Sequence, residues 1–139
     1  MDSGDTRRQL VDGFSLRELL ASALIIGLLA SIAIPLYIDQ KRKGHDADTK
    51  SDVSAVGNAV VNYLASHDTL PAMMASGTTA TIDGEESVTL SPGVVLGPLV
   101  GTNSTDWCVD GTNPDGDRAK VKGYKFTASV NKVEEGKCT

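Results

Sequence analysis

The sequence has few aromatic residues and no excess of positive charge, and each shortage argues against a class of protein. Only 4% of the residues are aromatic, too few for a surface that stacks nucleic-acid bases. The net charge of −5 repels a phosphate backbone, so we predict no specific nucleic-acid partner. The sequence holds no nucleophile motif, phosphate-binding loop or metal triad, so we predict that the protein is not an enzyme and uses no cofactor.

Apolar residues gather in one long run near the N-terminus. Residues 19–38 read LLASALIIGLLASIAIPLYI and include no charged side chain. A helix of this length rises about 30 Å, the thickness of the hydrocarbon core of a bilayer. The run therefore predicts one membrane-spanning helix. A conventional secretory signal is the competing interpretation, but its apolar stretch is shorter and a cleavage site follows it, whereas here the polar residues 39–43 continue the helical pattern.

One acidic residue, Glu18, stands directly before this apolar run. A carboxylate costs up to about 3 kcal/mol at the centre of a bilayer and less near its surface, so the position needs a partner. Ser15 supplies one explanation, because Ser-x-x-Glu is the spacing of a capping box at the start of a helix.

The wider motif supplies a second explanation. Residues 13–35, GFSLRELLASALIIGLLASIAIP, resemble the N-terminal signal of type IV pilins and pseudopilins. That signal has a glycine, a phenylalanine, a glutamate four residues after it, and a proline near the end of the apolar run. Gly13, Phe14, Glu18 and Pro35 occupy these places. The resemblance implies a structural subunit of a type IV pilus. The alternatives are a pseudopilin of a type II secretion system, a simple signal-anchored exported domain, and an enzyme anchored by this helix.

The resemblance also implies how the chain is processed and what it binds. A prepilin peptidase would cut between Gly13 and Phe14, so residues 1–13 would be a leader, and Phe14 would then be N-methylated. Glu18 would pair with the terminal amine of a neighbouring subunit. The implied partners are further copies in a filament, the peptidase and methyltransferase, the assembly platform and the membrane. The precursor would lie in the inner membrane and the filament at the cell surface.

Two features of the apolar run bear on helix packing. Ala23, Gly27 and Ser31 recur at four-residue steps, a pattern that lets helix backbones approach closely, although generic membrane-helix composition explains it equally well. Pro35 lacks an N–H and its ring crowds the carbonyl of Ser31, so we expect it to kink or loosen the helix.

Beyond the run, the pattern predicts that the helix continues to about residue 66. Val53, Val56 and Val60 recur at steps of three and four, which indicates one apolar face. We therefore predict a filament-core helix over residues 14–38, its amphipathic continuation over 39–67 and a globular head over 68–139. The positions assigned to the polar side of the continuation include Asp46, Asp48, Lys50, Asp52 and Asn58.

The head is predicted to be a small antiparallel sheet, which makes the fold class α+β. Residues 71–87 are rich in Ser, Thr and Gly, show little periodicity and are expected to form a connection. Strand-like pieces follow at residues 88–90, 93–96 and 107–109, and residues 123–130 give the best alternation.

The last third of the chain holds both cysteines and an acidic loop. Cys108 and Cys138 would form one disulfide in an exported chain and stay thiols in a cytosolic one, and many pilins close a C-terminal loop with a disulfide. The loop offers oxygen atoms that calcium binds in some pseudopilins, but no glutamate closes an EF-hand and Asn-Pro-Asp-Gly is an ordinary turn, so we predict no metal site. His45 and His67 are expected to be solvated helix residues. The oxygen-bearing loop residues are Asp110, Asn113, Asp115 and Asp117.

Overall fold

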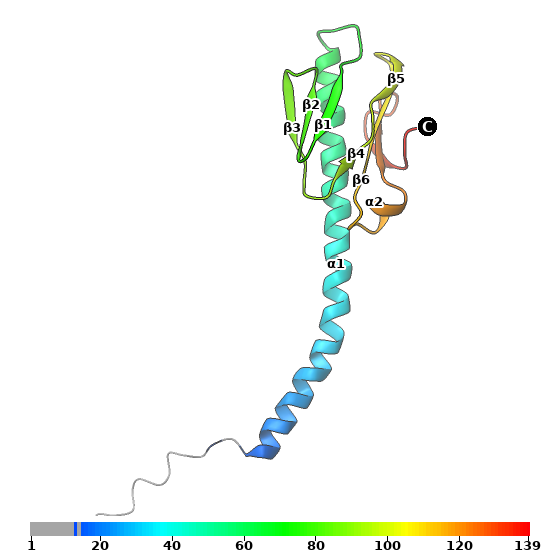
Figure 1. The fold of residues 1–139 in the computed structure, drawn as a ribbon. Coiled ribbons are helices and arrows are strands. Elements are labelled where there is room, and N and C mark those ends of the chain that lie inside the picture. The colour runs from blue at the N-terminus through cyan, green and yellow to red at the C-terminus, as the bar shows by residue number, and fades with distance from the viewer. Residues whose placement is uncertain (1–12, 14) are drawn as a thin grey trace, which may run out of the picture. The chain divides into compact units, whose positions relative to one another are not determined.

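The computed structural model describes Gly13 and residues 15–139, and residues 1–12 and Phe14 lie outside the described part. The chain divides into two compact units, and the boundary in the sequence falls between Ile38 and Asp39. One helix, α1 (Leu16–Leu64), contributes residues to both units (Figure 1). The helix ends two residues before its predicted end at about residue 66.

The first unit contains the apolar part of α1. Its large apolar side chains are exposed, from 77% at Leu16 to 46% at Ile38. By length and composition, α1 is able to cross a membrane. The helix continues through Pro35. An apolar surface of this extent requires lipid or other protein around it.

In the second unit, two antiparallel sheets lie beside the later part of α1 (Figure 1). The first sheet has three strands in sequence order, and the second has five. In the second sheet the order is β4-β6-β7-β8, and β5 also pairs with β6. The strands of the first sheet are β1 (Met73–Ser76), β2 (Thr79–Ile82) and β3 (Glu86–Thr89). The second sheet contains β4 (Val95–Leu96), β5 (Val100–Asn103), β6 (Asp106–Thr112), β7 (Tyr124–Thr127) and β8 (Val133–Glu135), and the short helix α2 (Arg118–Val121) joins β6 to β7.

The α+β class with an antiparallel head is confirmed, and the head contains two sheets where one was expected. The segment 71–87, expected to be a plain connection, contains β1, β2 and the start of β3. Tight turns make this possible, because Gly77 and Gly84 adopt positive φ angles of 59° and 74°. Ala80 and Ile82 alternate inward along β2 and are fully buried. The Thr-Ala-Thr-Ile alternation was therefore a strand signal within a polar segment.

One hydrophobic core joins α1 to both sheets. The predicted apolar face of α1 is confirmed, since Val53, Val56 and Val60 are fully buried. The first sheet contributes Ala80 and Ile82 from β2. The second sheet contributes residues from β6 and β7, among them Trp107, Val109, Tyr124 and Phe126.

Candidate functional site

The start of α1 is held by reciprocal hydrogen bonds between Ser15 and Glu18. The backbone N–H of Ser15 donates to Oε2 of Glu18 at 2.8 Å, and the N–H of Glu18 donates to the Ser15 hydroxyl oxygen at 3.4 Å. The capping-box explanation of Glu18 is therefore confirmed within the single chain. The carboxylate also lies at the positive end of the helix dipole. Its pairing with a neighbouring subunit stays a prediction.

The predicted cleavage site lies just before this cap. Gly13 is exposed, and open space surrounds the place where a side chain would stand. Phe14, the residue expected to be methylated, lies outside the described residues. Cleavage between the two residues thus stays a prediction.

The small residues of the apolar run share an exposed part of α1. Ala23, Gly27 and Ser31 are all exposed, and a Cβ at Gly27 would meet no atom within 4 Å. The Ser31 hydroxyl donates to the carbonyl of Leu28 at 2.7 Å, so its polar hydrogen is satisfied within the helix. Close packing of a second helix against these residues stays a prediction.

The C-terminal end of the chain is tied to the second sheet. Cys108 on β6 and Cys138 form a disulfide with their Cα atoms 5.8 Å apart, across a separation of 30 residues. The backbone N–H of Cys138 also donates to Oδ2 of Asp110 at 3.1 Å. The disulfide that an exported chain would form is therefore confirmed.

Two aspartates expected on the polar side of α1 are instead buried, so that assignment was wrong for them. Oδ2 and Oδ1 of Asp46 accept hydrogen bonds from the backbone N–H groups of Arg118, at 3.0 Å, and Ala119, at 2.9 Å. Asp52 accepts from the N–H of Ser91 at 2.6 Å and from its hydroxyl at 3.3 Å. These carboxylates fix α2 and the segment before β4 against α1. Nothing in the local sequence distinguishes them from solvated aspartates, because their partners lie in distant segments.

The acidic loop is organised as a turn. Asn113 is buried, its Oδ1 accepts from the N–H of Asp115 at 3.0 Å, and its amide donates to the Pro92 carbonyl at 3.4 Å. Asp110 is engaged by Cys138, and Asp117 precedes α2. Residues 15–139 contain no cluster of three or more His, Cys, Asp or Glu side chains able to hold a metal. The geometry gives no support to calcium here.

Each histidine meets only part of the expectation of a solvated helix residue, since His67 is exposed but not helical and His45 is helical but half-buried. His67 lies beyond the end of α1, and its ring stacks on that of Tyr63 with centroids 4.1 Å apart. His45 is on α1 but half-buried, and its Nδ1 has no hydrogen-bond partner among the described residues. The Tyr63 hydroxyl donates to Asp83 at 2.8 Å, which raises the pKa of Tyr63.

Comparison with known proteins relates the chain to a fimbrial protein. Fimbrial protein EcpC of Eikenella corrodens is 29% identical to it over 125 residues, which make up 88% of this chain and 78% of the relative. No family model matches the chain, and no solved structure matches it. The match covers most of the chain, and a long apolar helix followed by antiparallel sheets has the architecture expected of a pilin. The chain is therefore similar to a fimbrial protein over most of its length, and its long apolar helix fits a pilin, whereas the processing signal in residues 13–35 stays a prediction.

Proposed function

We propose that the chain is the structural subunit of a type IV pilus, which is made as an inner-membrane precursor and assembled through α1. The observation that carries the proposal is the exposed, uncharged run of residues 19–38 with Glu18 at its edge. Lipid surrounds this surface in the precursor, and the same run of neighbouring copies surrounds it in the filament. Similarity to a fimbrial protein supports a pilus subunit.

Processing precedes assembly in this proposal. A prepilin peptidase cuts the peptide bond between Gly13 and Phe14, on the side of the apolar run that remains in the cytoplasm. Because the cut lies before the run, the mature chain keeps its membrane helix. Methylation of the new N-terminal amine preserves its positive charge.

Glu18 and that amine then form a pair between adjacent subunits. Only Oε2 of Glu18 takes part in the capping box, so Oε1 can accept a second donor. A carboxylate among packed apolar helices is costly without a counter-ion. Removing one partner of a buried ion pair typically costs about 3–5 kcal/mol, because the other charge remains. The pair therefore favours one axial register of assembly over others.

The test compares two substitutions that both break the cap. Glu18→Ala removes the capping carboxylate and the proposed counter-ion, whereas Ser15→Ala removes only the capping hydroxyl, a change of about 1 kcal/mol. We expect Glu18→Ala to leave the precursor in the membrane fraction with no filaments in electron micrographs of the sheared fraction. We expect Ser15→Ala to assemble normally. Normal filaments from Glu18→Ala would reject the pairing. If shearing wild-type cells releases none of the processed chain, an internal pseudopilus is favoured over a surface pilus.

A further inference from the structure

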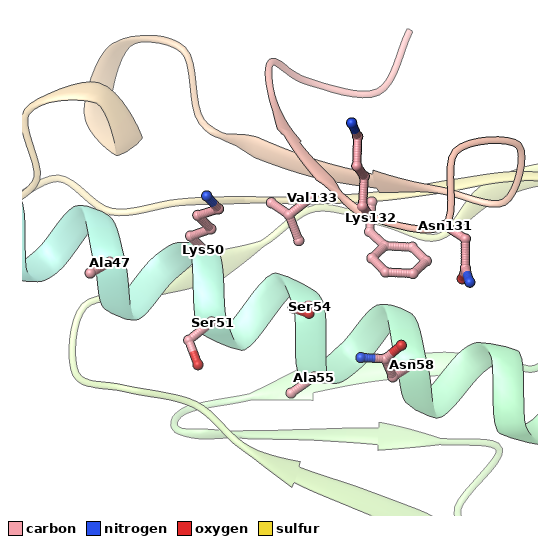
Figure 2. A pocket seen from close by; sticks show the side chains of 10 residues that line it. Ala47, Lys50, Ser51, Ser54, Ala55, Asn58, Asn131, Lys132 and Val133 are labelled. Carbon is pink, nitrogen blue, oxygen red and sulfur yellow. The ribbon is translucent and has the colours of Figure 1, made fainter.

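An open groove of about 800 Å³ lies beside the exposed face of α1 within the second unit (Figure 2). Small side chains of α1, among them Ser51, Ser54 and Ala55, form one wall. The facing wall is the segment that leads into β8, which is an edge strand because it pairs with β7 alone. Small residues on one wall leave room for an inserted segment.

The groove carries two lysines, one on each wall. Figure 2 shows Lys50 projecting from α1 and Lys132 from the facing segment. Lys50 forms no ion pair with the described residues, and Lys132 has only a 4.0 Å contact with the exposed Glu134. Two lysines among the residues that line one groove attract an anionic partner, even in a chain whose net charge is −5.

The turn between β2 and β3 has the complementary charge and a compact shape. Asp83, Glu85 and Glu86 place three carboxylates within four residues, and all three are exposed. None of them forms an ion pair with the described residues, whereas Glu135 is paired with Arg118 and Lys122. Positive φ angles at Asp83 and Gly84, 51° and 74°, make the turn tight. We call residues 83–86 the acidic turn.

The groove and the acidic turn lie at different levels along α1. The groove extends along α1 from Ala47 to Asn58, while the hydrogen bond from Tyr63 to Asp83 places the acidic turn beside residue 63. At the rise of an α-helix, the centres of the two surfaces differ by about 15 Å along the axis. A contact between different surfaces of identical copies generates a ring if the rotation closes and an open helical filament if it does not, and an offset along the axis of α1 is compatible with the filament.

We propose that the acidic turn of one subunit docks in the Lys50–Lys132 groove of its neighbour. The proposal rests on the proposed function, because it places both surfaces in a filament of identical chains. The occupant is thus residues 83–86 of a second copy, and the contact adds a specific register between heads to the packing of the apolar helices.

Charge reversal tests this contact in the full chain. One variant carries Lys50→Glu and Lys132→Glu, a second carries Glu85→Lys and Glu86→Lys, and a third combines all four. We expect each reversal to reduce the yield of sheared filaments about tenfold or more, and the combination to recover most of it. Lys137→Glu, an exposed change of the same charge outside the groove, should leave the yield unchanged.

The outcomes separate this proposal from the proposed function. If wild type forms filaments but the combined variant yields no more than either reversal, the docking contact is rejected and the pilin function stands. If reversing the groove reduces the yield but reversing the acidic turn does not, the groove has another occupant and the proposal is wrong. Absence of any wild-type filament, together with an uncut Met1, would reject the function itself.

Discussion

The ring of Phe126 lies against the backbone of Gly57, in the space that a side chain at position 57 would occupy. A Cβ built on Gly57 would overlap three atoms of that ring. Phe126 is almost fully buried on β7, so the ring has little room to move. This contact explains a glycine in the middle of α1, where glycine costs about 1 kcal/mol relative to alanine.

Gly57→Ala should therefore destabilise the head even though alanine favours helix. Overpacking a filled core typically costs about 1–3 kcal/mol, which exceeds the gain in helix propensity. Gly44→Ala is the matched control, since no atom lies within 4 Å of its added Cβ, and it should stabilise by up to about 1 kcal/mol. Denaturant unfolding measures both changes. Equal effects of the two substitutions would contradict the packing described at Gly57.

The single tryptophan reports the folding of the head in such measurements. Trp107 is 3% exposed and stacks on Phe126 with ring centroids 5.7 Å apart. Its fluorescence in detergent-solubilised full-length chain therefore follows loss of this core, without interference from the apolar part of α1.

Asp46→Ala should loosen α2 from α1. The substitution leaves the N–H groups of Arg118 and Ala119 without their acceptor, and an unsatisfied buried donor costs about 1–3 kcal/mol. Asp48→Ala changes an exposed aspartate two residues away and should stay within about 0.5 kcal/mol of wild type. Faster amide hydrogen exchange at residues 118–121 in Asp46→Ala alone would support this role. Equal exchange rates in both variants would rule out this role of Asp46.

Cys138→Ser should lower the stability of the head by about 3–4 kcal/mol. The disulfide with Cys108 closes a 30-residue separation, and the chain-entropy model gives a stabilisation of that size. Reduced wild type should match Cys138→Ser in urea unfolding followed by Trp107 fluorescence. A reduced wild type as stable as the oxidised protein would show that the disulfide contributes nothing.

The Arg118–Glu135 pair should make stability depend on pH in the acid range. Arg118 donates to Glu135 at 2.6 Å, and this hydrogen bond lowers the pKa of Glu135 below its ordinary 4.5. The pair thus stabilises the fold at pH values above 4.5, and that contribution is lost as pH falls through the lowered pKa. The effect is small because both side chains are exposed.

Thermal unfolding of wild type and Glu135→Gln at several pH values measures this contribution. We expect wild type to have the higher Tm at pH 7 and the difference to vanish in strong acid. A difference that is constant across pH would assign the effect of Glu135→Gln to packing instead of charge.

Regular patterns in the sequence were sufficient to predict the long helix and some strands of the head. The valine steps predicted the buried face of α1, and residues 107–109 and 123–130 correctly located β6 and β7. The latter strand is shorter than expected and ends at Thr127. The presence of two cysteines in a chain expected to be exported was enough to predict the disulfide.

Features that depend on distant partners could not be predicted. Asp46 and Asp52 have the local pattern of solvated helix residues, yet their partners lie 72 and 39 residues away. In the first sheet, the strand-like piece predicted at residues 88–90 overlaps β3, but β1 and β2 were missed. Burial does not mark β1, because it is largely exposed. Gly57 weakened the helix prediction locally. The reason for a glycine there could not be read from the sequence, because the ring that requires it belongs to Phe126 on β7.

Mass spectrometry of the N-terminus of the assembled protein tests the central claim most directly. The chain recovered from sheared filaments should begin at Phe14, carry one methyl group on its terminal amine and extend through residue 139. An intact Met1 would show that no prepilin peptidase acts on the chain. A new N-terminus after residue 38 would show that the apolar helix is removed as a conventional signal, which would contradict assembly through α1.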